Sequence, residues 1–273
     1  MTQSDSIIEQ TEVIDEARAQ CFISLLPVDL GGDPNRYRPG RDWVRNPYRI
    51  HQRILMAFAD AMPNHAEEKS GKERDCHQSI LYRMDAEAGL QRVFVLSTAE
   101  PDWGKAFHNA SVLLDARRPC VTREVSIMVR RGQTWRFRLR ANATRRAPSS
   151  PIDKENKKRP RFAVKEAGQI PWLQRQGDMH GFSVTPEWVR VMSSGMQVSW
   201  RKKLEESSEV EAAQCDPKDA KGMFKNKLMK HWRVDYEGIL QVTCPTKYVD
   251  ALISGIGPGK AFGFGLLSIA PAG

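Results

Sequence analysis

A histidine and a tyrosine three residues apart are the best candidates for chemistry in this sequence. Tyr48 and His51 follow Asn46-Pro47, where asparagine is a favourable helix N-cap and proline suits the first helical position. Residues three apart in a helix share a face, so the two side chains would stand together in the first turns. Imidazole, with an ordinary pKa of about 6.5, exchanges protons at neutral pH. This pair could therefore cleave RNA without a metal by moving protons for attack of the 2′-hydroxyl. From residue types alone, an unreactive surface histidine remains the alternative.

A second candidate site is a run of glycines around one lysine near the C-terminus, Gly255-Ile-Gly257-Pro-Gly259-Lys260-Ala-Phe-Gly263-Phe-Gly265. Glycines adopt positive φ without strain and can turn successive N–H groups toward an anion, to which Lys260 adds charge. The run lacks the Ser or Thr that follows the Gly-Lys pair of a P-loop, and it does not fit a dinucleotide fingerprint. The sequence therefore predicts phosphate contact without a nucleotide cofactor. A glycine-rich turn before a buried terminal strand is the alternative.

The positive charge of the chain is concentrated in one block. The formal net charge is +9, and residues 130–161 hold twelve Lys or Arg against Asp153 and Glu155, a net charge of +10. Such a block is typical of a nucleic-acid interface, although a solvated charged loop remains possible. Residues 133–140 alternate apolar and basic side chains, which predicts a half-buried strand followed by a mobile basic loop. The RNA-binding candidates in this block are Arg136, Arg138, Arg140, Arg145, Arg146, Lys157, Lys158, Arg159 and Arg161.

The elements that must position these groups form a repeated α+β pattern. The first copy begins with a strand at 21–28, a loop at 30–45 and the His51 helix, which ends at about Met62. Strands at 79–83 and 92–97 follow, then a helix at 103–114, and a strand at 135–140 closes the copy. This order is βαββαβ, as in ferredoxin-like and RRM-like folds. A linker helix at 165–176 would follow, and then a less regular second copy of the pattern. This second copy would have strands at 181–184, 189–192, 196–200, 232–242 and 264–269 and a helix at 246–254.

The predicted boundaries give four segments. They are an acidic, mobile tail at 1–20, an N-terminal ferredoxin-like domain with the catalytic helix at 21–145, a basic loop and linker helix at 146–178, and a C-terminal ferredoxin-like domain with the glycine-rich loop at 179–273. Five cysteines without a C-x-x-C pair predict neither a disulfide framework nor a zinc ribbon, and Cys76-His77 with His65 would make a poor metal site. No apolar run is long enough for a membrane span. We expect a cytoplasmic protein without metal or cofactor.

Five segments in the same order resemble the CasE family, the CRISPR RNA-processing endoribonucleases of type I-E Cascade. They are NPYRIH at 46–51, TAEPDW at 98–103, FRLRAN at 137–142, IPWLQR at 170–175 and the terminal GIGPGKAFGFGLLSIAP. The resemblance spans residue 21 to the C-terminus. It implies two tandem ferredoxin-like domains. It also implies cleavage of precursor CRISPR RNA at the base of the repeat hairpin, a 2′,3′-cyclic phosphate end made without metal, and retention of the product in Cascade.

Carried over by position, the resemblance makes His51 the catalytic histidine and Tyr48 its assistant. The five glycines and Lys260 then correspond to the family's glycine-rich loop, and the basic strand and loop to the segment that follows the RNA hairpin. The partners implied are repeat hairpin RNA and the other Cascade subunits, with no membrane. The acidic segment before Cys21 and the loop at 30–45 are longer than the family's usual opening. Two alternatives remain open: a structural RNA-binding subunit that cuts nothing, and a general binder of double-stranded RNA.

Overall fold

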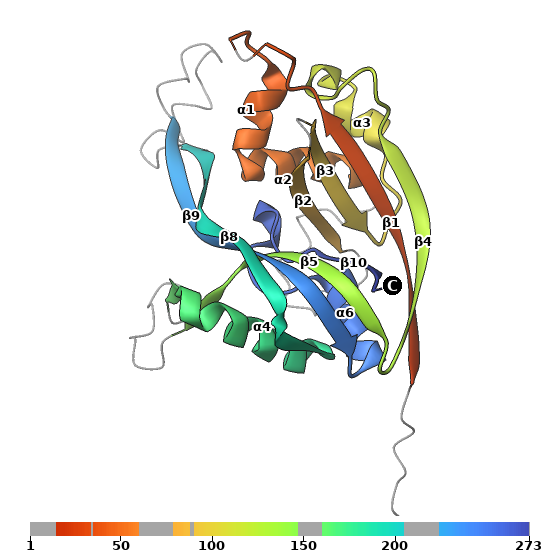
Figure 1. Cartoon of the computed structure of the whole chain (residues 1–273). Coiled ribbons are helices and arrows are strands. Elements are labelled where there is room, and N and C mark those ends of the chain that lie inside the picture. Colours follow the sequence, from red (N-terminus) through yellow and green to blue (C-terminus); the bar gives the residue numbers. More distant parts are fainter. Residues whose placement is uncertain are drawn as a thin grey trace, which may run out of the picture.

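Two antiparallel sheets, each of four strands, form the body of the molecule. The computed structural model describes residues 15–33, 35–59, 79–87, 90–146, 160–204 and 224–272. Figure 1 shows the two sheets with helices α1 to α3 beside the first, and α4 and α6 on one side of the second. Within these ranges, no helix is long and apolar enough to cross a membrane.

The first sheet has the order β2-β3-β1-β4. Its strands are β1 (Glu16–Val28), β2 (Ile80–Glu87), β3 (Leu90–Ser97) and β4 (Val121–Arg130). Helix α1 (Pro39–Arg45), helix α2 (Pro47–Leu55) and the 3₁₀ turn η1 (Met56–Phe58) lie between β1 and β2, and α3 (Trp103–Phe107) and η3 (Ser111–Leu113) lie between β3 and β4. The apolar face of α2, with Ile50 and Ile54 fully buried, packs in the same core as Val93 and Val95 of β3.

The second sheet has the order β10-β5-β9-β8. Its strands are β5 (Thr134–Asn142), β8 (Phe182–Leu204), β9 (Phe224–Val242) and β10 (Leu267–Pro271). Helix α4 (Glu166–His180) connects β5 to β8, whereas α6 (Pro245–Ser254) and the 3₁₀ turn η6 (Lys260–Phe262) lie between β9 and β10. A small separate sheet pairs β6 (Thr144–Arg146) with β7 (Arg161–Ala163).

Both sheets place their strands in the ferredoxin-like order, with the first strand of each unit between the fourth and the third. The predicted fold class, two tandem ferredoxin-like units, is therefore confirmed. The second unit is the less regular one, because the pairing of β8 with β9 shifts register between Val184 and Val189 and again between Val191 and Ser193.

The strand around Trp135 is where the predicted layout is wrong. It does not close the first sheet but is the first strand of the second, since β5 pairs with β10 and β9. The first sheet is closed by β4, which pairs with β1 and for which the predicted layout has no strand. Helix α4 is consequently the crossover helix of the second unit and not a linker. We propose the boundary between the units at residues 131–133 in place of residue 145.

Two segments expected to be irregular contain regular structure. Residues 16–20 belong to β1 and pair with residues 126–130 of β4, so these residues are part of the first sheet and not of a tail. Ion pairs of Glu16 with Arg130 and of Asp15 with Arg131 hold this end of the strand. The loop at 30–45 contains α1, which buries Trp43 against Phe107 at a ring-centroid distance of 5.6 Å.

Candidate active site and RNA-binding surface

Asn46 fixes the start of the helix that carries the candidate catalytic pair. Its side-chain oxygen accepts from Tyr48 N at 3.2 Å, and Pro47 occupies the first helical position, as the sequence predicts. The same amide also joins the two units: its Nδ2 donates to Trp200 O at 2.8 Å, and its Oδ1 accepts from Trp200 N at 3.3 Å. Asn46 is only 1% exposed, so these bonds hold α2 against β8 out of water.

His51 lies on a face of α2 that is shielded but still open to solvent. Its ring stacks on Tyr82 with centroids 6.4 Å apart, and the Tyr48 ring lies 6.5 Å from it on the same helix. Desolvation lowers the pKa of His51 below its ordinary value of 6.5. In the described part of the chain no hydrogen bond occupies either ring nitrogen, so the neutral imidazole is available to a substrate.

Tyr82 supports this arrangement from the first sheet. Its buried hydroxyl donates toward the Pro47 carbonyl at 2.6 Å, and the Ala261 carbonyl lies 3.2 Å from the same hydroxyl. One side chain thus contacts both the start of α2 and the glycine-rich loop, while its ring forms the floor under His51. Burial raises the pKa of Tyr82 well above its ordinary value, which keeps the hydroxyl protonated as a donor.

The second unit completes the surroundings of the pair. Phe262 in η6 stacks on Tyr48 with centroids 6.0 Å apart, and His231 of β9 lies 4.1 Å from Phe262. Gln197 of β8 donates its amide to Phe262 O at 2.7 Å. Burial lowers the pKa of His231 as well. The candidate active site is therefore built from both halves of the chain.

All five glycines of the C-terminal loop have positive φ, between 77° and 90°. A Cβ at these positions would meet the protein itself: at Gly255 it would lie 2.8 Å from Leu81, at Gly263 3.1 Å from Tyr82, and at Gly265 2.9 Å from Ile256 O. The glycines thus allow the loop to pack tightly beside Tyr82. Contact of Gly257, Gly259 and the rest of the loop with RNA stays a prediction. Lys260 is half-buried, and burial lowers its pKa.

The arginines of β5 lie as the alternating pattern predicts, but acidic partners hold two of them. Phe137 and Leu139 are buried, while Arg136 and Arg138 are exposed. Arg138 pairs with Glu237 at 2.5 Å, and Arg140 pairs with Asp235 at 2.7 Å and donates to Met84 O at 2.9 Å.

Two of these arginines, Arg136 and Arg138, line an open hollow of about 440 Å³ between β5, β9, β10 and β2. The positive field along β5 is consequently weaker than the sequence predicts, because Glu237 and Asp235 of β9 neutralise part of it.

The small β6–β7 sheet carries the remaining described basic candidates. Arg145, Arg146 and Arg161 are exposed there, and Arg161 donates to Thr144 Oγ1 at 3.2 Å. Burial, and then the charge of Arg146, lowers the pKa of Arg161. Lys157, Lys158 and Arg159 lie outside the described residues, as do His65, Cys76 and His77.

Comparisons with known proteins decide the family. The model of the "CRISPR associated protein" family matches residues 26–271. The chain belongs to the CRISPR-associated CasE family. Among its curated relatives, "CRISPR-associated endoribonuclease Cse3" of Thermus thermophilus is 29% identical over 86% of this chain and 94% of that protein. "CRISPR system Cascade subunit CasE" of Escherichia coli is 31% identical over 85% of this chain and 95% of that protein.

Solved structures of the family agree with the fold. A structure of "CRISPR endoribonuclease Cse3 bound to 19 nt RNA" has a TM-score of 0.64 and 25% identity, covering 93% of this chain and all of that one. Sequence reasoning on this CasE-family chain did not find the aromatic residues around the candidate pair: Tyr82 and Phe262, which contact it, and His231, which contacts Phe262. They come from β2, η6 and β9, and no local spacing connects them to α2. Only Phe262 stood inside a segment already singled out, the glycine-rich loop.

Proposed function

We propose that this protein is a metal-independent endoribonuclease that cleaves precursor CRISPR RNA at the base of the repeat hairpin. It leaves a 2′,3′-cyclic phosphate and stays on the mature RNA as a cytoplasmic Cascade subunit. The observation that carries the proposal is the placement of Tyr48 and His51 side by side, half-shielded, beside the glycine-rich loop. The names of the relatives, an endoribonuclease and a Cascade subunit, support it.

His51 takes the role of the base in this proposal. Its lowered pKa keeps the ring neutral at pH 7, so it can accept the proton of the attacking 2′-hydroxyl. Tyr48, on the same face of α2, carries a hydroxyl that can donate to the scissile phosphate or to the leaving 5′-oxygen. Lys260, in η6 two residues before Phe262, supplies positive charge near the phosphorane. The exposed arginines of the β6–β7 sheet and of β5 contact the hairpin mainly through its backbone.

The deciding experiment compares wild type with His51→Ala on the labelled CRISPR repeat RNA of the host genome, in EDTA, scoring cleavage and gel-shift binding. We expect wild type to cut and His51→Ala to lose about 10² to 10⁴ in rate while still binding, since general acid–base groups act mainly in the transition state. His108→Ala, an exposed histidine at the end of α3, is the matched control and should cut normally.

Two further measurements in the same experiment test the finer claims. Replacing the nucleotide before the cut with its 2′-deoxy form removes the nucleophile and should abolish cleavage, and mass spectrometry of the upstream product should find the cyclic phosphate. If wild type and His51→Ala both bind and neither cuts, the protein is a structural RNA-binding subunit. Equal loss of binding and cutting in His51→Ala would contradict its catalytic role.

A further inference from the structure

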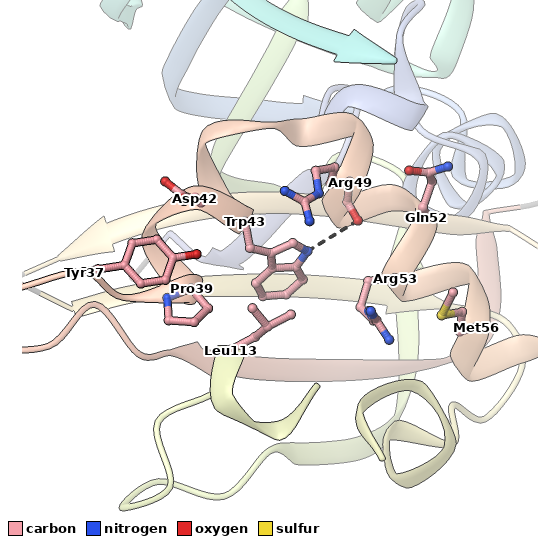
Figure 2. A pocket seen from close by; sticks show the side chains of 9 residues that line it. All are labelled: Tyr37, Pro39, Asp42, Trp43, Arg49, Gln52, Arg53, Met56 and Leu113. Carbon is pink, nitrogen blue, oxygen red and sulfur yellow. Dashed lines mark hydrogen bonds between the residues drawn. The ribbon is translucent and has the colours of Figure 1, made fainter. Parts of the chain in front are cut away.

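The side of α2 that faces away from His51 lines a separate hollow of about 280 Å³. Figure 2 shows Arg49, Arg53 and Met56 of α2 and η1 along one wall, with Tyr37 and Asp42 across from them. Arg49 and Arg53 lie two residues on either side of His51, which at 3.6 residues per turn places them on roughly the opposite face. The hollow is therefore distinct from the candidate active site but shares its helix.

The charge in this hollow is positive and partly unpaired. Arg53 is held by Ala106 O and Asn109 Oδ1, both at 3.0 Å from its Nη1, so its guanidinium is fixed in place. Arg49 makes no ion pair with any described residue, and the carboxylate of Asp42 pairs with Arg45 at 3.4 Å. Two like charges four residues apart on a helix repel each other. A bound anion would relieve that repulsion.

The rest of the lining suits a planar ring. The Tyr37 side chain is 72% exposed at the rim, and Met56 is 47% exposed across from it. The floor is Trp43, whose indole N–H donates to Arg49 O at 3.3 Å and thereby fixes the position of this wall. Gln52 adds an amide that can read the edge of a base. Pockets for drug-sized ligands begin at about 300 Å³, so this hollow fits a group no larger than one nucleotide.

We propose that this hollow binds one unstacked nucleotide of single-stranded RNA next to the repeat hairpin, a site that rests on the proposed function. The base stacks on Tyr37, and the phosphate contacts Arg49 and Arg53, the combination by which proteins hold single strands. This hollow and His51 lie on opposite sides of the same helix, α2, whose diameter is about 10 Å. One RNA strand can therefore reach both places, which favours RNA over a free nucleotide as the ligand. A strand that leaves the reaction centre around α2 arrives at the hollow.

The test measures affinity for three repeat RNAs, each with a 2′-deoxy nucleotide before the cut so that none is cleaved. One is the bare hairpin, one has single-stranded nucleotides added on the 5′ side, and one has them on the 3′ side. The proteins are wild type, Tyr37→Ala, Arg49→Ala and the control Arg45→Ala, which removes an exposed arginine of α1 outside the hollow.

We expect one extension to tighten binding by wild type about fivefold or more, the order of one stacked base. Tyr37→Ala and Arg49→Ala should lose that gain while binding the bare hairpin like wild type, and Arg45→Ala should keep it. 2-Aminopurine in the extension should lose fluorescence on wild type but not on Tyr37→Ala. Whichever extension responds identifies the flank that is bound.

Three results would overturn the site. The first is that neither extension changes the affinity of wild type. The second is that Tyr37→Ala and Arg49→Ala affect the three RNAs no differently from the control Arg45→Ala. The third is that adenosine monophosphate binds the hollow while the extensions have no effect. Failure here leaves cleavage of the repeat RNA by wild type unaffected, so it is distinguishable from failure of the proposed function. Thermal melting of each variant checks that it is folded.

Discussion

Asn46→Ala should destabilise the protein more than any surface substitution on α2, because one buried amide serves two elements. The side chain caps α2 through Tyr48 N and exchanges two hydrogen bonds with the backbone of Trp200 on β8. Alanine removes all three bonds and leaves the Trp200 groups facing an apolar methyl. Helix α2, which carries the candidate catalytic pair, would then lose both its cap and its attachment to the second unit.

The expected cost follows from these bonds. Loss of an N-cap costs about 1 kcal/mol. Each of the two bonds to Trp200 contributes about 1 kcal/mol, with more lost if its partner stays buried and unsatisfied. The free energy of unfolding should therefore fall by about 3 kcal/mol, which for a chain of this size lowers Tm by roughly 6–12 °C. Asn46→Ser keeps a capping oxygen but cannot reach Trp200, so it should lose about 2 kcal/mol.

Denaturant unfolding and thermal melting measure these differences, and cleavage of the repeat RNA measures the effect on the site. Asn35→Ala, an exposed asparagine in the segment before α1, is the matched control and should change stability by less than about 0.5 kcal/mol. If Asn46→Ala has the same Tm as Asn35→Ala, the Asn46 amide does not join α2 to β8 in solution, and the account of how α2 is held is wrong.

Two other predictions concern the loop and the base. Gly263→Ala should destabilise by about 1–2 kcal/mol, because φ is +80° and the new Cβ would lie 3.1 Å from Tyr82. Gly32→Ala, with open space around it, should be neutral in the same melting assay. For His51, a base with a pKa below 6.5 makes kcat/KM rise with pH to a midpoint below 6.5 and stay level above it. A rate that instead falls between pH 6 and 8 would make His51 the acid.

The sequence predicted the local parts of this structure well and the long-range pairings poorly. Asn46 and Pro47 indicate the start of α2 because capping depends on adjacent residues alone. The assignment of the Trp135 strand failed for the opposite reason. Alternation shows that a strand has one buried face, but not which sheet it joins, and the partner of β5 is encoded about a hundred residues away in β9.

The same limit applies to the candidate site. His51 and Tyr48 could be found from their spacing, whereas the contribution of Phe262 and His231 depends on how the two units dock. The positive block was visible in composition, but its neutralisation by Glu237 and Asp235 was not, because those carboxylates lie on a neighbouring strand. Charge counted along a chain overstates the field wherever a sheet brings the opposite charge alongside.

The division of the site between α2 and η6 has a consequence for the protein while it is being made. His51 and Tyr48 leave the ribosome about two hundred residues before Phe262 and the loop that contacts Tyr82. A nascent chain therefore carries its histidine without the surface that would hold an RNA beside it. The proposed ribonuclease activity would therefore appear only after η6 has been made and has packed against α2.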